Sequence, residues 1–367
     1  MVLELSGVIL EKYTLLNNIY IRNNLCKLKE IMKYLKNKKE GKKIPKVSFV
    51  ICTLNCKEYT ERCVKSIRSQ NYPQDKVEIV VVDSYSTDGT IEIAKEYGAR
   101  VILTKIRGYM EGKGMPKSIG CESAKGDIVI TIDSDNALVE KDWIKNMIHP
   151  LMNDKKIDYA ICRMAIVKTD DIVNRYLSYV GTDPFAIYGS LDPQIRMGYV
   201  KLKDKKKYWV YHNSKNNFLI TGGYYLAFKK STLKKMGGYS RDVDVAYAFA
   251  SRKRGANIAI PKNAHMHHLI TKSYSDFMRK KIKWGKYYFL NADKKERSHN
   301  WSMGYFGRFG KINFAYQTIK SLILIPDTIT GIKMALKYKD KTWLIHPLMT
   351  FSTVIAYGTA FIKAKLS

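Results

Sequence analysis

Acidic residues are scarce in this chain. Its 367 residues include 33 Asp and Glu against 64 Lys and Arg, which gives a formal charge of +31. Charge of this size says little about fold, but it points to anionic partners such as nucleotides, nucleic acid or a membrane surface. Some of these cations, such as those in the run 203–207, are expected only to be solvated.

Several familiar signatures are also missing. The six cysteines show no zinc-type pairs, so we expect reduced thiols in a cytosolic setting. The first residues lack the basic-then-apolar pattern of a secretory signal. The glycine-rich stretch 108–114 matches neither a P-loop nor a dinucleotide fingerprint, and we interpret it as a mobile wall.

The sequence divides into three parts. Residues 1–46 form a basic extension, with a predicted helix over 15–39 and a lysine-rich linker. Residues 47–270 alternate apolar strands with helical segments of 10–15 residues, which predicts an α/β fold with a mostly parallel central sheet flanked by helices. Residues 271–367 are aromatic, basic and apolar, and are predicted to be helical and membrane-associating.

Within the middle part, we predict strands at 47–52, 77–82, 100–104, 127–132 and 256–260. Helices are predicted at about 58–70, 88–97, 116–125 and 243–253.

Polar residues follow three predicted strands at the point where each ends. The segment 128–132 runs into Asp133 and Asp135, 77–82 into Asp83, and 47–52 into Thr53 and Asn55. Ligands of open α/β sheets bind at the carboxyl ends of the strands. Two carboxylates one residue apart suit Mg²⁺ or Mn²⁺ beside a phosphate, although such a pair also occurs in plain turns.

These positions suggest individual roles. Asp135 is expected to hold the metal, and Asp133 to contact a ribose or a metal-bound water. Asp83 could accept hydrogen bonds from a base edge or a ribose. Lys117, at the start of a predicted helix, could meet a nucleotide or its diphosphate, or could be a solvated lysine. Ser86 and Asp88 are expected to cap the helix after Asp83.

Together these segments resemble the inverting glycosyltransferases of family 2, which have the GT-A fold. The resemblance rests on the following segments: Thr53-Leu54-Asn55, Val82 to Thr90, Lys117-Ser118-Ile119-Gly120, Gly126-Asp127, Asp133-Ser134-Asp135 and Gly237-Gly238. It covers roughly residues 47–285 and implies a nucleotide-diphosphate sugar donor and a divalent metal. Lys117 stands where the family has arginine, so it keeps the charge but loses the bidentate fork.

Other assignments come from the resemblance alone. The family's acidic pair falls at 243–244, where the Glu is absent, so Asp244 is expected to be the catalytic base, with Asp242 in reserve. Both could instead cap a helix, and an ionised acceptor such as a polyprenyl phosphate would need no base. A family histidine near the metal is assigned to His267. Trp284 could stack on a ligand or pack in the core.

The segment 277–284 resembles a family motif that reads Gln-x-x-Arg-Trp in processive members. Lys280 and Lys283 occupy the Gln and Arg positions here. This departure argues against a processive polymerase.

The C-terminal part suggests a membrane. Residues 343–362 contain no Asp, Glu, Lys or Arg, and at about 1.5 Å per residue they could cross a bilayer core of about 30 Å. Three arrangements stay open: a helix pair lying on anionic lipid, a single span, and packing on the catalytic domain or on a second copy in a homo-oligomer. We therefore expect a lipid-linked or glycan acceptor at the cytoplasmic face of the membrane.

Two other functions fit the sequence less well. A sugar-nucleotidyltransferase needs a glycine-rich, basic loop after its first strand, and residues 53–58 contain no glycine. A nucleic-acid-binding protein would fit the charge, but the basic residues are dispersed and no binding module is recognisable, so no specific nucleic-acid partner is expected.

Overall fold

The computed structural model describes residues 44–106, 115–221, 225–239, 248–290 and 310–367. Five expectations lie wholly or partly outside these residues: the helix 15–39, the loop 108–114, the first five residues of the helix 243–253, and the candidate bases Asp242 and Asp244. Residues Lys46–Ser367 form one compact unit, which is described here. The domain boundary expected near residue 270 stays a prediction.

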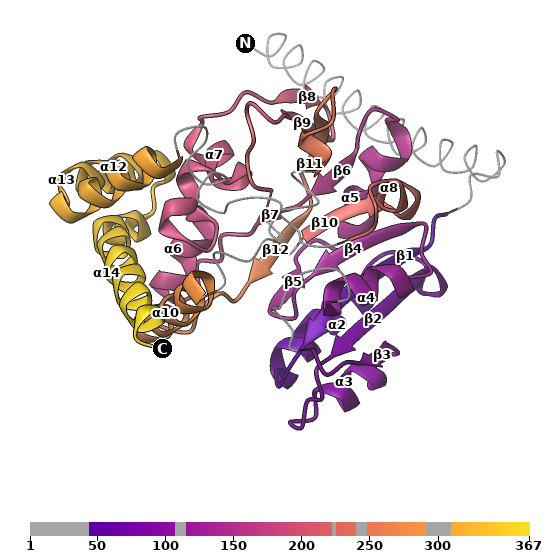
Figure 1. The fold of residues 1–367 in the computed structure, drawn as a ribbon. Helices are drawn as coiled ribbons and strands as arrows, with labels where there is room; N and C mark the ends of the chain where they lie inside the picture. The colour runs from indigo at the N-terminus through magenta and orange to yellow at the C-terminus, as the bar shows by residue number, and fades with distance from the viewer. Residues whose placement is uncertain (1–43, 107–114, 222–224, 240–247, 291–309) are drawn as a thin grey trace, which may run out of the picture. The chain divides into compact units, whose positions relative to one another are not determined.

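A large mixed sheet is the centre of this unit (Figure 1). Its strand order is β3-β2-β1-β4-β10-β6-β11-β9-β8, and β10 and β9 run antiparallel to their neighbours. The strands are β1 (Val47–Thr53), β2 (Val77–Asp83), β3 (Arg100–Leu103), β4 (Ile128–Ile132), β6 (Tyr159–Ile161), β8 (Lys203–Lys205), β9 (Tyr208–Asn213), β10 (Tyr225–Lys229) and β11 (Ala256–Pro261).

A second, three-stranded sheet has the order β5-β12-β7. It consists of β5 (Asn136–Leu138), β12 (His265–His268) and β7 (Arg163–Met164). Because β5 begins directly after Asp135 and pairs with β12, this sheet brings the histidines to the end of β4. The sequence patterns did not predict it.

The helices lie around the sheets and at the C-terminal end. They are α2 (Lys57–Arg68), α3 (Thr90–Glu96), α4 (Pro116–Ser123), α5 (Trp143–Asn153), α6 (Ile172–Val180), α7 (Leu191–Met197), α8 (Lys230–Lys235), α10 (Tyr274–Leu290), α12 (Gly310–Ile323), α13 (Ile325–Tyr338) and α14 (His346–Lys365). Short 3-10 helices are η1 (Gln74–Lys76), η2 (Pro184–Tyr188) and η4 (Lys341–Ile345).

The parallel part of the sheet follows the predicted pattern. In β4 all five residues are buried, as are six of the seven in β1, which explains their continuous apolar sequences. The pairings of β1 with β2 and β4 are parallel, and so is that of β2 with β3. The fold class inferred from the alternation is therefore confirmed.

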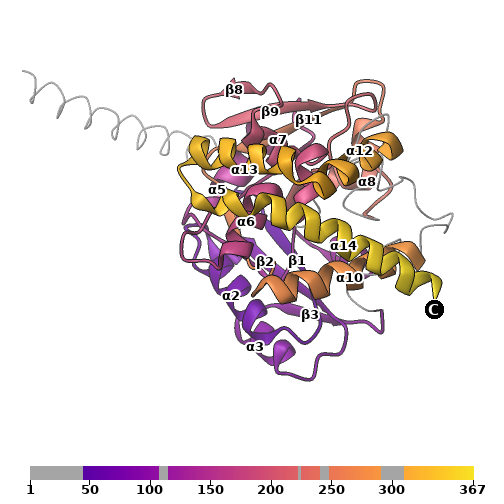
Figure 2. The same ribbon diagram turned by 90° about the vertical axis from the view of Figure 1, so that its left-hand side faces the viewer.

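The C-terminal helices share a second core with α6. Tyr176 and Leu177 of α6 pack with Phe277 of α10, Trp343 of η4 and Met349 of α14. The rings of Tyr176 and Trp343 meet edge to face, with centroids 5.9 Å apart. Figure 2 shows α12, α13, α14 and α10 along one side of the unit. These helices therefore pack against α6 and η2.

Close packing of α4 on the sheet generates a stability prediction. A Cβ atom at Gly120 would lie 2.3 Å from Val50 Cγ1 and 3.0 Å from Val82 Cγ2. Overpacking of this kind costs about 1–3 kcal/mol, so Gly120→Ala should lower the free energy of unfolding by that amount in urea.

Gly358→Ala is the matched control, because nothing lies within 4 Å of its added Cβ. That helical substitution should be neutral or stabilising by up to about 1 kcal/mol. Equal midpoints for wild type and Gly120→Ala would contradict the tight packing of α4.

Candidate active site at the carboxyl ends of the central strands

The polar ends of β1 and β2 are joined directly. Thr53 and Asp83 are register partners in the parallel pairing of these strands. The Thr53 hydroxyl donates to Asp83 Oδ2 over 2.6 Å, and both residues are buried. The two positions inferred from the strand ends therefore form one unit.

Asp83 organises the loop that follows it. The Ser86 amide donates to Oδ1 over 2.7 Å, and the Ser86 hydroxyl donates to Oδ2 over 2.6 Å. Together with Thr53, three donors converge on a carboxylate that can accept about four hydrogen bonds. These bonds give Asp83 a structural role in addition to the ligand contact expected from the sequence.

Asn55 links the loops after β1 and β2. Its amide donates to Ser86 Oγ over 2.8 Å, and its side-chain oxygen accepts from the Thr87 amide over 2.9 Å. Its φ of 47° is a left-handed conformation that Asn tolerates better than most residues. Asp88 accepts from the amides of Thr90 and Lys57, so it caps both α3 and α2.

A hollow of about 380 Å³ borders this loop. Its lining includes Lys57, Ser86, Gly89, Glu92 and Glu96. The two glutamates make it a poor place for a diphosphate, so we do not assign the donor to it.

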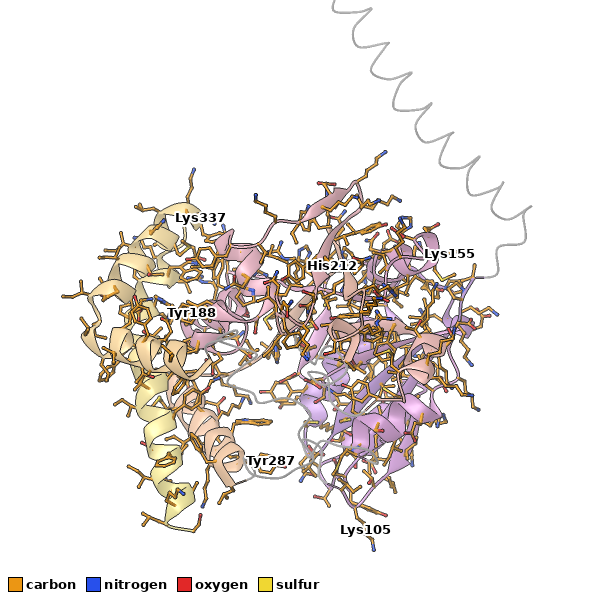
Figure 3. The ribbon with its side chains drawn as sticks, turned by 45° about the horizontal axis from the view of Figure 1, so that its top comes forward. Lys105, Lys155, Tyr188, His212, Tyr287 and Lys337 are labelled. Carbon is orange, nitrogen blue, oxygen red and sulfur yellow. The ribbon has the colours of Figure 1, made fainter. Side chains whose placement is uncertain are left out.

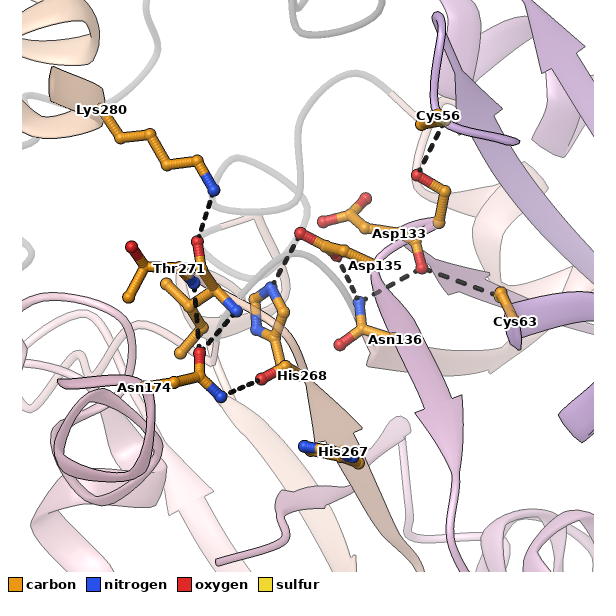
Figure 4. Close-up of polar contacts among 12 residues, drawn as sticks. Cys56, Cys63, Asp133, Asp135, Asn136, Asn174, His267, His268, Thr271 and Lys280 are labelled. Atoms are coloured by element: carbon orange, nitrogen blue, oxygen red, sulfur yellow. Dashed lines mark hydrogen bonds and ion pairs between the residues drawn. The ribbon is translucent and has the colours of Figure 1, made fainter. Parts of the chain in front are cut away.

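The end of β4 carries the acidic corner, which we define as Asp133 and Asp135 (Figure 4). Lys117 Nζ lies 3.0 Å from Asp133 Oδ1, and His268 Nε2 lies 3.2 Å from Asp135 Oδ2. The segment is also a turn, since the Asn136 amide donates to the Asp133 carbonyl over 3.2 Å. Each carboxylate thus faces a nitrogen from another element.

The histidine beside Asp135 is His268, whereas the sequence analysis had chosen His267. Successive side chains of a strand point to opposite faces, and β12 pairs His268 with Asn136. His267 instead lies 2.9 Å from Asp170. Burial lowers the pKa of His267 below its usual value despite this carboxylate.

Arg62 of α2 connects the acidic corner to β12. Its guanidinium donates to the Asp135 carbonyl over 3.1 Å and to the His267 carbonyl over 3.0 Å. The Leu269 amide also donates to the Asp135 carbonyl. Arg62 was not identified from the sequence, because nothing local in α2 indicates a contact with a strand about 200 residues later.

Lys280 of α10 affects the acidic corner through its positive charge. Burial alone would raise the pKa of Asp135, but the charges of His268 and Lys280 hold it below its usual value. Lys280 Nζ donates to the Ile270 carbonyl over 2.7 Å and lies 3.1 Å from Asp276 Oδ2. The residue at the Gln position of the family motif therefore adds a positive charge near Asp135.

Of the remaining candidates, Trp284 is half exposed on α10, which is not the position of a core side chain. Asp242 and Asp244 lie outside the described residues. The last described residue before them is Tyr239, whose carbonyl accepts from the Ser118 hydroxyl over 2.7 Å.

The side chains at the acidic corner suit a metal ion that also binds the phosphates of a substrate. No group of three or more metal-ligating His, Cys, Asp or Glu side chains occurs in the part of the chain that the structure describes. Mg²⁺ in particular is usually bound by one or two carboxylates plus substrate phosphates and water. Asp133 and Asp135 fit that mode.

Comparison with known proteins identifies the class. A sheet of this topology, with acidic residues after its central strands, is a GT-A fold. The model of the family described as glycosyl transferase family 2 matches residues 48–224. Residues 48–224 are therefore assigned to this family, and they make up just under half of the chain.

Individual relatives match parts of the chain. Poly(ribitol-phosphate) beta-N-acetylglucosaminyltransferase TarS of Staphylococcus aureus is 30% identical over 103 residues, which are 28% of this chain and 18% of that protein. A dolichyl N-acetyl-alpha-D-glucosaminyl phosphate 3-beta-D-2,3-diacetamido-2,3-dideoxy-beta-D-glucuronosyltransferase of Methanococcus voltae is 30% identical over 113 residues, which are 30% of this chain and 35% of that protein.

Among solved structures, the mannosyltransferase PcManGT of Pyrobaculum calidifontis, in complex with GDP-Man and Mn²⁺, aligns over 89% of this chain and 94% of its own. The identity is 17% and the TM-score 0.49. The matches to curated relatives cover between 15% and 46% of those proteins' lengths.

The pairing of Lys117 with Asp133 generates a binding prediction. Lys117→Met removes the cation that competes for this carboxylate, so Mn²⁺ alone should bind more tightly. A partly exposed ion pair is worth about 0.2–1 kcal/mol, which corresponds to a gain of up to roughly fivefold in calorimetric titrations. Lys125→Met, at an exposed position past the end of α4, should leave Mn²⁺ affinity unchanged. Weaker Mn²⁺ binding by Lys117→Met would contradict this role.

Proposed function

We propose that this protein transfers a sugar from a nucleotide-diphosphate sugar to an acceptor, with inversion at the anomeric carbon and dependence on Mg²⁺ or Mn²⁺. The acidic corner is the observation that carries the proposal. Its two carboxylates follow β4, Lys117 and His268 lie against them, and the charge of Lys280 helps to lower the pKa of Asp135. Family membership supplies the reaction class.

Asp135 and Asp133 would hold the divalent cation, which supplies charge neutralisation for the departing diphosphate. His268, rather than His267, is the histidine placed to orient Asp135. Lys117 and Lys280 bring two positive charges to the same place. An ammonium that pairs with a carboxylate before the donor binds is available for a phosphate oxygen afterwards.

The nucleoside is assigned to the loops after β1 and β2. Thr53, Asn55 and Asp83 are fixed by mutual hydrogen bonds through Ser86. Such pre-ordering lowers the entropy lost when a ligand is bound. Asp83 retains the capacity for about one further hydrogen bond, from a base edge or a ribose hydroxyl.

Inversion requires attack on the face opposite the leaving group, with a base near the acceptor hydroxyl. Asp244 is assigned as this base, with Asp242 as the alternative. An ionised phosphate acceptor would need neither. Trp284, half exposed on α10, is assigned to stacking against a bound ligand.

The acceptor is proposed to be lipid-linked or a glycan, reached at the cytoplasmic face of the membrane. The charge of +31 favours an anionic surface. The names of two relatives support this class, since one acts on poly(ribitol-phosphate) and the other on a dolichyl phosphate-linked sugar.

Asp135→Asn tests the metal assignment. It removes a charged ligand but keeps the shape of the side chain, so Mn²⁺-dependent binding of UDP- or GDP-sugars should fall at least tenfold. Turnover of the donor should fall with it. Binding is measured by calorimetry and turnover by nucleotide release.

Asp142→Asn is the matched control, because Asp142 is an exposed residue before α5 that pairs only with Lys145 among the contacts described. It should behave as wild type. Undiminished Mn²⁺-dependent donor binding by folded Asp135→Asn protein would remove Asp135 from the site.

A further inference from the structure

The helix α13 exposes a stripe of apolar side chains to solvent. Ile325, Ile329, Ile332 and Leu336 lie at i, i+4, i+7 and i+11, and they are 66%, 61%, 48% and 74% exposed. This spacing places them on one stripe. The buried residues of α13 are Asp327, Gly331 and Met334, and Asp327 is fully buried. A surface helix in water would expose polar side chains along such a stripe and would not bury a carboxylate.

The neighbouring helix α12 also exposes apolar side chains and buries polar ones. Ile312, Ile319 and Ile323 are between 54% and 69% exposed, while Ser321 is buried. Only 15% of the Lys320 side chain is exposed. The stripes of the two helices make up what we call the apolar face: Ile312, Ile319, Ile323, Ile325, Ile329, Ile332 and Leu336.

A polar network fills the space beneath this face. Lys320 Nζ lies 2.8 Å from Asp327 Oδ1, and the Ser321 hydroxyl donates to Asp327 Oδ2 over 2.9 Å. Lys320 also donates to the Tyr188 hydroxyl over 2.8 Å, next to the C-terminal helices in Figure 3. These contacts fix the orientation of α12 and α13, so rotation of either helix to hide its stripe would break a buried ion pair.

Exposure of this face to water is unfavourable, because apolar surface is stabilised by leaving water. The charges around it indicate what covers it. Between residues 310 and 367 the only acids are Asp327, which is buried, and Asp340, which pairs with Arg175. The exposed lysines of this region are Lys333, Lys337, Lys339, Lys341, Lys363 and Lys365. An apolar stripe bordered by lysines matches an anionic bilayer surface.

One helix of the described chain, residues Lys341–Lys365, is long and apolar enough to cross a membrane, and 39% of its apolar window is buried. Its α14 part packs against α10, where a Cβ at Gly285 would lie 2.8 Å from Ala360 Cβ. Exposed charges such as Arg279 and Lys283 lie on α10. Those charges could not accompany α14 through hydrocarbon at low cost.

We propose that the apolar face of α12 and α13 inserts into one leaflet of an anionic bilayer, with α14 held on the protein rather than spanning. The choice of a membrane as partner rests on the proposed function. The surface would place the acidic corner and the head groups of lipid-linked acceptors on the same side of the bilayer.

The test uses the full chain and vesicles of phosphatidylglycerol or phosphatidylcholine. Wild type should co-sediment with the anionic vesicles, and I329E/I332E should bind at least tenfold more weakly. L103E/M152E is the matched control, because Leu103 and Met152 are exposed to a similar extent on β3 and α5. It should bind as wild type.

Three results would overturn the proposal. The first is equal vesicle binding by I329E/I332E and wild type. The second is resistance of bound wild type to alkaline carbonate, which would mean a spanning helix. The third is a dimer in solution that I329E/I332E abolishes, without vesicle binding by wild type, which would mean a second copy on this face.

Donor binding in solution separates this proposal from the proposed function. I329E/I332E should keep wild-type Mn²⁺-dependent nucleotide binding, because its residues are remote from the acidic corner. Loss of vesicle binding alone therefore bears on the membrane surface, and loss of nucleotide binding in Asp135→Asn alone bears on the transferase site.

Discussion

Charge compensation at the end of β4 is the interaction on which the rest of the site depends. Asp133 faces Lys117 of α4, and Asp135 faces His268 of β12. Arg62 of α2 binds the backbone of β12 and of the turn after β4 at this point. Three elements distant in sequence are thereby held around two carboxylates. Removing one partner would leave a charge without compensation in a partly buried place, which costs more than an exposed pair gains.

The same principle explains the C-terminal helices. Buried Asp327 is compensated by Lys320 and Ser321, and the apolar residues of α12 and α13 face outward. At the acidic corner, the ion-paired groups lie where a charged ligand is expected to bind. Beneath α12 and α13, Lys320, Ser321 and Asp327 contact one another, and the outer surface of the two helices is apolar. In the first case ion pairs join α4 and β12 to the acidic corner, and in the second an ion pair joins α12 to α13.

Much of the sheet could be predicted because its central strands are apolar runs, such as Ile128–Ile132, that end in polar residues. The choice between His267 and His268 could not, since it depends on the register of β12 against β5, and both strands are short and partly polar. Arg62 was missed because its contacts are long-range, and Lys280 was noted only as a departure from the family motif. Asp83 was placed correctly at the strand end, but its bonds to Ser86 depend on loop geometry that a single sequence does not reveal.

The central claim is that the protein carboxylates and a donor diphosphate bind the metal together. Calorimetric titration of UDP or GDP, with and without Mn²⁺, and of Mn²⁺ with and without nucleotide, tests it most directly. The account predicts that each ligand tightens the other by the same factor, since binding linkage is reciprocal. Nucleotide affinity that is independent of Mn²⁺ would contradict the account.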